Sequence, residues 1–360
     1  MKTAKDALAG AAIVVRDQKQ IMRAPFSGGD VMAMALLAST PLWAAMPDAL
    51  LRSLCRLLSW VLPREWHQDT DAATIEELGG FSAAEVRVIL RRQLEFRMLS
   101  LGMFLKDLVW KRGYEIEVEG AGRVEAALAN GRGAVLWLAD FVFGSDVARQ
   151  GLYRIGHPTG HMSRPEHGFS QSAFGVRYLN PIRVRAEDVY VDERIVFQRD
   201  RPAAALSIMS DRLRKNGLVS ILACAYEGRS VAETDLFHGK LKLATGGPRL
   251  AFKERCPILP VFIAPAPEPP YFTVTIGEPL RMTSAAKDVA ILEAVKDFVE
   301  QLKPRIEAAP HLWRGWSSLV AKDSATPALK CPARAAAAPI NSNLGMAARA
   351  RFEGGLVPYP

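Results

Sequence analysis

AVLWLADFVFGSD, residues 134–146, is the stretch that decides the fold of this chain. Its first half, AVLWLA, is apolar throughout and has the length of one strand, so it predicts a β-strand that is buried on both faces. Strands of that kind are typical of a parallel sheet covered by helices. Asp140 and Asp146 follow, and polar groups are therefore expected where this strand ends.

The alternation of strand and helix continues through most of the chain after Tyr114. Alternation at this spacing predicts an α/β protein with a mainly parallel sheet flanked by helices. The run YFTVTIG is expected to join the sheet as an antiparallel strand. The functional loops are expected at the carboxyl ends of the strands. The expected strands are residues 114–120, 134–139, 160–163, 218–225, 257–263 and 271–277, and the expected helices are residues 121–131, 145–156, 203–217, 246–256 and 289–308.

The composition divides the chain into four parts. Residues 1–30 form a polar N-terminal extension, residues 31–113 a helical membrane-associated segment, and residues 114–310 the α/β domain. Residues 324–360 are rich in Ala, Pro, Gly and Asn, a composition that predicts a disordered tail without catalytic content.

An apolar run, VMAMALLASTPLWAAMP, occupies residues 31–47. It lies too far from the start of the chain for a secretory signal, and its length and internal Pro41 make it marginal for a bilayer span. In the helix predicted next, DALLRSLCRLLSWVLPREW, Arg52 and Arg56 lie on one face among leucines. That pattern is typical of a helix lying on a membrane with its basic side chains at the headgroups. An ordinary helix packed on the domain is the alternative.

Ser82 and Glu85 form a capping box that predicts the start of a long helix, which continues to Gly113. Basic helices usually just present a solvated face. Beside the apolar N-terminal segment, however, this helix favours apposition to a membrane. Most of its surface is apolar, and its basic side chains are Arg87, Arg91, Arg92, Arg97, Lys106 and Lys111.

The charge balance limits the classes of partner. The formal net charge of +8 favours an anionic membrane surface, an acidic carrier protein or a phosphorylated substrate. Nucleic acid is disfavoured, because the chain has no zinc-finger spacing, no RNA-binding aromatic signature and no dense basic stripe with interleaved aromatics. The four cysteines are far apart and predict reduced, mostly buried thiols in a cytosolic protein. No metal or redox cofactor is implied, since no zinc-ligand spacing and no GxGxxG after a strand are present.

The loop SRPEHGFSQSAFG, residues 163–175, carries the first candidate site residues. Arg164 could hold a phosphate or carboxylate, and His167 could transfer a proton because its ordinary pKa lies near neutrality. A surface turn in which Arg164, Glu166 and His167 form a local cluster is the alternative. His161 lies inside the preceding strand and is more typical of a core histidine.

The loop AYEGRS, residues 225–230, follows a very apolar strand. Glu227 and Arg229, with Gly228 between them for close approach, suit a polar headgroup that carries hydroxyls and phosphate. A salt-bridged turn is the alternative.

A fourth loop, LFHGKLKLATGGP, is expected over residues 236–248, and it contributes His238 and Gly239 as substrate-binding candidates. Gly246 and Gly247 precede Pro248, and the backbone N–H groups of this segment would make an anion site at a helix N-terminus. The same residues are also an ordinary helix start.

Taken in order, these segments resemble the glycerolipid and lysophospholipid acyltransferase superfamily, and within it the bacterial lipid A biosynthesis (lauroyl/myristoyl) acyltransferases. The resemblance covers roughly residues 31–310. It includes the apolar N-terminal segment, the long basic helix, the VEG strand leading to GRGAVLWLA, the SRP segment, and FHGKLKLATGGPRLAFKERCPILPVF. AYEGRS is also similar to the FPEGTRS-type motif of the superfamily. Glu227 and Gly228 match the residues that help hold the acceptor there, whereas Arg229 arrives one position early.

The chain departs from this family at the motif that carries the chemistry. The family has a histidine, four residues, then Asp or Glu, with the histidine as general base and the acid orienting it. Asp146 matches the acid, but Phe141 stands where the histidine should be, and phenylalanine cannot take a proton.

Three interpretations of this departure remain open. Asp140 could act as the base if burial and the charge of Asp146 raise its proton affinity. A histidine from another loop could fill the same space with Asp146 orienting it, His167 first and His161 or His238 next. In the third interpretation the site no longer catalyses, and the chain is a lipid-binding relative that acts as a binding or accessory protein.

The resemblance implies an acyltransferase at the cytoplasmic face of the inner membrane. It would move a fatty acyl group from acyl carrier protein or coenzyme A to a lipid hydroxyl or amine. Arg164, or backbone groups beside Gly144, would stabilise the oxyanion. An α/β hydrolase with a serine nucleophile is disfavoured, because the chain has no GxSxG elbow.

Overall fold

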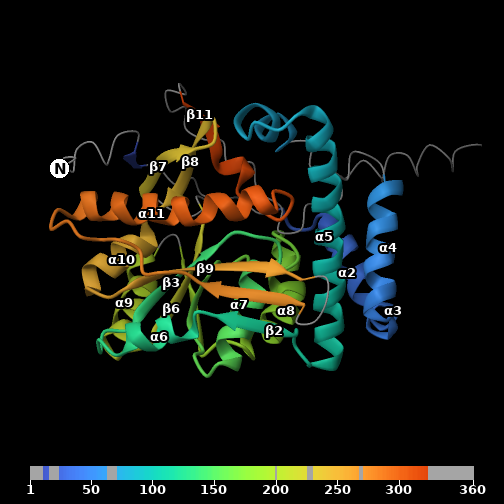
Figure 1. The fold of residues 1–360 in the computed structure, drawn as a ribbon. Helices are drawn as coiled ribbons and strands as arrows, with labels where there is room; N and C mark the ends of the chain where they lie inside the picture. The colour runs from blue at the N-terminus through green and yellow to red at the C-terminus, as the bar shows by residue number, and fades with distance from the viewer. Residues whose placement is uncertain are drawn as a thin grey trace, which may run out of the picture.

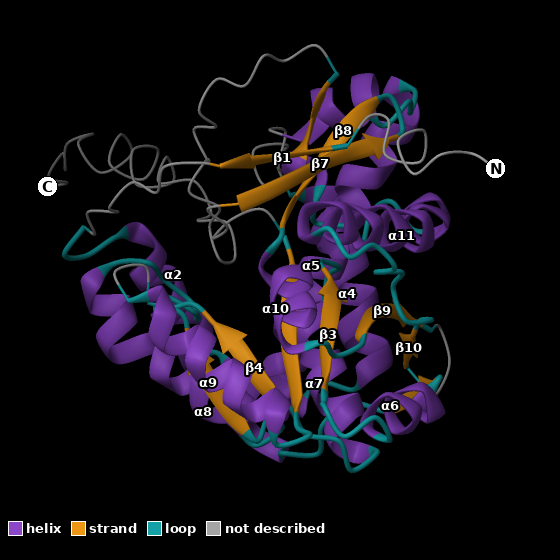
Figure 2. Ribbon diagram, turned by 90° about the vertical axis from the view of Figure 1, so that its left-hand side faces the viewer, coloured by secondary structure: helices purple, strands orange, loops and turns teal. Residues whose placement is uncertain are grey.

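Two sheets organise the protein (Figure 1, Figure 2). A large sheet of seven strands is flanked by helices, and a small sheet of four strands lies apart from it. This arrangement confirms the α/β class with a mainly parallel sheet. The computed structural model describes residues 11–15, 24–62, 71–198, 201–224, 230–266 and 271–322.

The large sheet has the strand order β2-β10-β9-β3-β6-β4-β5. Strands β9, β3, β6, β4 and β5 are parallel to one another. Strand β10 is antiparallel to β9, as the sequence predicted for YFTVTIG, and β2 is parallel to β10. The bounds are β2 Ile116–Glu119, β3 Ala134–Ala139, β4 Gly160–Ser163, β5 Glu193–Val196, β6 Leu218–Ala223, β9 Ile258–Pro265 and β10 Phe272–Ile276.

Strand β3 lies at the centre of this sheet, between β9 and β6. All of its residues are at most 1% exposed, which explains why the stretch is apolar at every position rather than at every second one. The ring of Trp137 packs 4.4 Å from that of Phe298 in helix α11. The predicted strand that opens the sequence analysis is thus the centre of the hydrophobic core.

Helices cover both faces of the large sheet (Figure 1). The connections β3 to β4 and β6 to β9 run in opposite directions across the sheet. Right-handed crossovers therefore place α7 on one face and α10 on the other. Helices α9 and α11 contact α10 and share its face. The bounds are α6 Ala121–Leu128, α7 Gly144–Arg154, α8 Asn180–Asp188, α9 Pro202–Arg214, α10 Gly246–Glu254 and α11 Lys287–Ala308, with a π-helical turn at Gly175–Leu179 before α8 and a 3-10 turn at Trp316–Ser318 after α11.

The small sheet has the order β1-β7-β8-β11. It corrects the sequence analysis, in which residues 236–248 are expected to form one loop: β7 and β8 form a hairpin there, turning at Phe237 and His238. The Lys-Leu alternation of GKLKLA is the two-residue period of a strand. The bounds are β1 Ala12–Val15, β7 Ser230–Leu236, β8 Gly239–Ala244 and β11 Leu319–Ala321.

The N-terminal segment is helical, as predicted, and stands at one side of the large sheet (Figure 1). Helices α2, α3 and α4 lie outside the long helix α5, which begins after the capping box of Ser82 and Glu85. Leu51 and Cys55 of α4 are fully buried. The bounds are α2 Gly28–Ala38, α3 Thr40–Ala45, α4 Asp48–Val61 and α5 Ala83–Trp110, with a π-helical turn at Thr74–Leu78 before α5.

The apolar run of residues 31–47 is divided between two helices, α2 and α3, which are interrupted at Ser39. Among the described residues, no helix is both long enough and apolar enough to cross a membrane. The predicted tail, residues 324–360, and most of the N-terminal extension, residues 1–10 and 16–23, lie outside the described residues.

Truncation of β3 tests its central position. We expect Leu138→Ala to lower the free energy of unfolding by about 2–5 kcal/mol, because Leu138 is fully buried and its removal leaves a cavity. Val189→Ala is the matched control: that side chain is 59% exposed, so the change should be about 0.5 kcal/mol or less. Denaturant unfolding of both variants measures the difference, and equal losses would contradict the assignment of β3 to the core.

Candidate functional site

The site lies at the carboxyl ends of β3 and β6. The chain leaves these neighbouring strands in opposite directions, from β3 through α7 to β4 and from β6 through the small sheet and α10 to β9. In open α/β sheets a crevice forms at such a switch point, and ligands bind there. Asp140 directly follows β3 and Cys224 directly follows β6. The structure therefore places a carboxyl group and a thiol group at this crevice.

Asp140 is held in place by the segment that follows α11. Its backbone carbonyl accepts a hydrogen bond from the N–H of Arg314 at 2.8 Å, and Nε of Arg314 lies 3.7 Å from its Oδ1. Phe141 and Trp313 form an antiparallel bridge beside this contact. Asp140 is 5% exposed whereas the side chain of Arg314 is 38% exposed, so the ion pair connects a buried carboxyl group to the surface.

The loop after Asp140 turns sharply into α7. Phe143 has φ +70°, a left-handed conformation that is an outlier for a bulky residue. Its ring packs 4.9 Å from that of Phe272 and 6.3 Å from that of Phe96 in α5. The buried ring thus offsets the strain of the turn, which fixes the direction of the chain on leaving Asp140.

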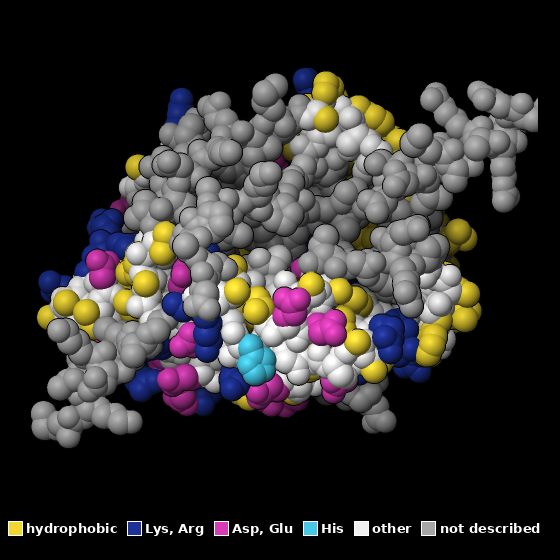
Figure 3. All heavy atoms as spheres, turned by 90° about the horizontal axis from the view of Figure 1, so that it is seen from above, with side chains coloured by type: hydrophobic (Ala, Val, Ile, Leu, Met, Phe, Trp, Pro, Cys, Tyr) yellow, Lys and Arg dark blue, Asp and Glu magenta, His cyan; other side chains and the backbone are white. Residues whose placement is uncertain are grey.

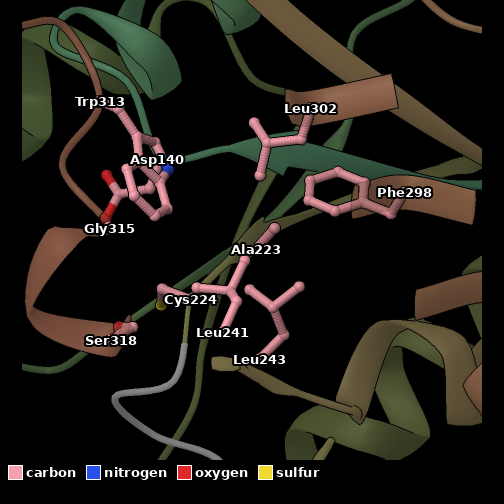
Figure 4. A pocket seen from close by; sticks show the side chains of 10 residues that line it. All are labelled: Asp140, Ala223, Cys224, Leu241, Leu243, Phe298, Leu302, Trp313, Gly315 and Ser318. Atoms are coloured by element: carbon pink, nitrogen blue, oxygen red, sulfur yellow. The ribbon is translucent and has the colours of Figure 1, made fainter. Parts of the chain in front are cut away.

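A small cavity adjoins Asp140 (Figure 4). Its volume is about 10 Å³, room for roughly one water molecule. Asp140, Cys224 and Ser318 supply its polar groups, and most of the remaining lining is apolar. The apolar lining comes from β6, β8, α11 and the segment after α11: Ala223, Leu241, Leu243, Phe298, Leu302 and Trp313.

Asp146 lies in a second group of charges, a buried ion-pair cluster formed by Asp146, Arg149, Arg183, Glu187 and His167, with Arg194 at its edge. Asp146 is in the first turn of α7 and accepts hydrogen bonds from Arg149 and, at 3.0 Å, from Arg183. Glu187 of α8 is the centre of the cluster, because three arginines and His167 lie within ion-pair distance of it. Burial raises the pKa of Glu187, but His167, Arg149 and Arg183 outweigh this effect and hold it well below its usual range.

His167 belongs to this cluster through Glu187. Its Nε2 lies 2.7 Å from Oε2 of Glu187. Burial lowers the pKa of His167, and the carboxylate opposes that shift only in part. Both carboxylate oxygens of Asp146 are engaged by arginines. The structure therefore brings His167 and Asp146 into one cluster, in which His167 bonds to Glu187 and Asp146 bonds to arginines.

The other candidate histidines lie elsewhere. His161 is 5% exposed in β4, with Nδ1 2.9 Å from the hydroxyl oxygen of Ser220, and burial holds its pKa well below the usual value. His238 is exposed in the turn between β7 and β8, where its backbone N–H donates to the carbonyl of Leu78. Gly239 begins β8 and pairs across the small sheet with Ala321.

Arg164 directly follows β4 and is partly buried. It is not among the residues that line the cavity beside Asp140. The candidates Glu227, Gly228 and Arg229 lie outside the described residues, in the segment that begins after Cys224.

The structure adds residues that the sequence analysis missed. Arg314 and Glu187 contact candidate residues that are remote in sequence, and no motif surrounds either of them. The signal for Cys224 is its position directly after an apolar strand, which is the same signal that singled out Asp140. Within the described residues no group of three or more His, Cys, Asp or Glu could hold a metal ion.

The fold and these contacts define the class: an α/β protein with a small, mostly apolar cavity beside Asp140 at the switch point of a mostly parallel sheet. Neither the protein-family models nor the curated proteins compared with this chain give a match. The resemblance to lipid A acyltransferases therefore stays a hypothesis supported by the sequence motifs quoted above.

Replacement of Glu187 tests whether the ion-pair cluster is a structural unit. We expect Glu187→Gln to lower the free energy of unfolding by about 3–5 kcal/mol, because it leaves buried arginines such as Arg149, 1% exposed, without their counter-charge. Glu193→Gln is the control, since that side chain is 46% exposed and lies 4.0 Å from its partner. Denaturant unfolding at neutral pH measures both, and a loss no larger than that of the control would contradict the prediction.

The pH dependence of stability gives a separate prediction. The depressed pKa of Glu187 adds stability that is present above the ordinary carboxyl pKa of 4.5 and is lost as the pH falls through the lower folded-state value. We therefore expect the wild type to lose stability on acidification below about pH 4.5, and Glu187→Gln to lose less over the same range. Thermal unfolding between pH 7 and pH 3 measures this, and parallel curves for the two proteins would contradict it.

Proposed function

We propose that this chain is an acyltransferase that moves a fatty acyl group from an acyl thioester to a lipid hydroxyl or amine at a membrane surface. The observation that carries the proposal is the position of Asp140. It is a buried carboxyl group at the switch point of the sheet, beside an apolar cavity and an arginine. In this proposal Asp140 is the general base that the family motif lacks at Phe141.

The reaction needs a base and a thioester. Asp140 takes the proton of the acceptor hydroxyl or amine as its oxygen or nitrogen attacks the thioester carbonyl carbon. The tetrahedral intermediate then collapses, the C–S bond breaks, and the leaving thiolate takes up the proton. The oxyanion of the intermediate needs hydrogen-bond donors or a cation. Arg314 is a closer candidate for that cation than Arg164, because its guanidinium already lies beside Asp140.

Three contacts favour Asp140 over His167 as the base. His167 is engaged by Glu187, and Asp146 is engaged by Arg149 and Arg183. Rearrangement of His167 towards Asp146 would break buried ion pairs, which is costly. Asp140 lies outside this cluster and lines the cavity.

Charge and position support the proposed donor and location. A net charge of +8 suits an acidic acyl carrier protein or the phosphates of coenzyme A, and also an anionic membrane. Phe96 and Phe104 of α5 pack against loops that follow β3 and β4, so the N-terminal helices stand at the same edge of the sheet as Asp140. We place the protein at the cytoplasmic face of the inner membrane, with no metal or redox cofactor in the reaction.

One observation favours a second candidate function, a catalytically retired lipid-binding relative. Phe141 is 3% exposed and is bridged to Trp313. The position of the family histidine is thus filled by a core aromatic side chain. In this alternative the cavity and the apolar helices are kept for binding alone, and the chain acts as a binding or accessory protein.

Transfer of label from acyl carrier protein or coenzyme A to membrane lipid tests the proposal. We expect Asp140→Asn to lower the rate at least about a hundredfold, as loss of a general base predicts. Asp235→Asn, an exposed aspartate on β7, is the matched control and should keep the wild-type rate. Lipid mass spectrometry measures the product.

The other outcomes are informative as well. Loss of activity in His167→Asn together with full activity in Asp140→Asn would move the base to His167. No label in any lipid with either donor, from a folded wild-type protein, would favour the retired relative.

A further inference from the structure

The outer layer of N-terminal helices exposes large apolar side chains. This layer, α2, α3 and α4, packs on α5 at one end of the molecule (Figure 1). Figure 3 shows hydrophobic side chains beside basic ones at the right-hand edge, the side on which α4 stands in Figure 1. The large apolar residues exposed on this layer are Val31, Met32, Met34, Leu42, Leu50, Leu57, Trp60 and Val61, from 38% to 72% exposed.

Few charges accompany these side chains. Among residues 24–62 the charged ones are Asp30, Asp48, Arg52 and Arg56. Asp30 is buried, and Asp48 pairs with Lys106 of α5. Arg56 pairs with Glu95 of α5, and its side chain is 73% exposed. A group of exposed apolar side chains with few charges among them is typical of contact with a partner or a membrane rather than with water alone.

Two exposed tryptophans lie near the two ends of α5, on which this layer packs. The guanidinium of Arg91 lies 3.8 Å from the ring centroid of Trp60, which is 66% exposed. At the other end of α5, the guanidinium of Arg112 lies 5.6 Å from the ring of Trp110, which is 52% exposed and donates its indole N–H to the carbonyl of Ala44. Tryptophan beside a cation is the pairing found at the headgroup level of a bilayer.

The packing of α5 decides how this layer can meet a bilayer. Arg91 and Trp110 are separated by a rise of about 28 Å along the helix at 1.5 Å per residue, close to the thickness of a hydrocarbon core. The opposite side of α5, however, packs along the α/β domain through Phe96, Phe104 and Asp107. If α5 crossed the bilayer, the adjoining domain with its ion-pair cluster would have to enter the hydrocarbon, at a prohibitive cost. The layer must therefore lie flat.

We infer that the layer α2–α4 inserts in the plane of one leaflet of an anionic membrane, so that the edge of the sheet that carries Asp140 faces the lipid. This inference deepens the proposed function. It rests on that function in one respect, namely that the membrane supplies the acceptor lipid. Insertion in one leaflet agrees with helices that are each too short to cross. It also places both Trp–Arg pairs at one interface.

The charges favour a lipid surface over a second copy of this chain. Arg91 and Arg112 lie beside the exposed tryptophans, and Arg56, which pairs with Glu95, is 73% exposed, so a symmetric dimer through this face would bring these like charges together. Anionic headgroups complement the same cations, each worth about 1 kcal/mol near a membrane surface. The partner that these charges favour is therefore an anionic leaflet, and the test distinguishes it from self-association.

Flotation of the full chain with vesicles tests the inference without any acyl donor. We use phosphatidylcholine vesicles with and without phosphatidylglycerol, and expect tighter binding when the anionic lipid is present. Leu50→Glu/Leu57→Glu should weaken binding at least about tenfold, because two apolar contacts are replaced by charges that lipid headgroups repel. Leu206→Glu/Ile208→Glu on α9 is the matched control, since those side chains are also exposed, and it should bind as the wild type does.

Two further measurements establish the depth. Brominated lipids should quench the fluorescence of the wild type more than that of Trp60→Phe. Alkaline carbonate should release the wild type from vesicles, as it does a protein held in one leaflet.

Each contrary result overturns the inference. The first is equal binding by the two double variants, and the second is retention of the wild type on the vesicles after carbonate. The third is absence of flotation together with a dimer in light scattering that Leu50→Glu/Leu57→Glu converts to monomer. The flotation experiment contains no acyl donor, so its result does not depend on label transfer. The protein can bind vesicles without transferring label, or transfer label without binding through this layer. The proposed function and this inference can therefore fail separately.

Discussion

Burial of β3 on both faces is the constraint on which the rest of the structure depends. The strand is covered by α7 on one face and by α10 and α11 on the other, and it lies between two parallel neighbours. A strand in that position has to be apolar along its whole length, and the first polar residue can appear only where it leaves the core. Asp140 is that residue. The group to which we assign the chemistry is therefore the first residue after the strand whose side chains have to be apolar.

The two charged groups near this point have different physical characters. Asp140 is connected to solvent through Arg314, and it adjoins an apolar cavity. The cluster around Glu187 joins α7 and α8 through several ion pairs, of which the one between Glu187 and Arg149 is the most deeply buried, and Asp146, Arg149 and Glu187 line a second small cavity. The pairs of this cluster hold α7 and α8 together, and Asp140, which pairs with Arg314, is not a member of it. The contacts of His167 and Asp146 within this cluster are the reason that we propose Asp140, rather than His167, as the base.

Much of the fold could be predicted from the sequence, and the misses have physical reasons. Strands such as β3 and β6 could be predicted because a strand that is buried on both faces is apolar at nearly every position. The hairpin of β7 and β8 was missed because the turn at Phe237 and His238 carries no Asn-Gly or Gly-Gly signal. The edge strand β5 and helix α8 were missed because both are short and polar. Among the site residues, Asp140 and Asp146 could be singled out by position, but their partners could not.

The sequence by itself determined the α/β class, most of the strands and helices of the large-sheet domain, and a helical, apolar and basic N-terminal segment, because hydrophobic periodicity and helix capping are local properties. Only the tertiary structure decided that Arg314 reaches Asp140, that Glu187 rather than Asp146 contacts His167, and that α5 lies flat along the domain. Those contacts join residues far apart in the chain. They arise from the way the elements pack, and no periodic pattern in the sequence indicates which distant residues will be in contact.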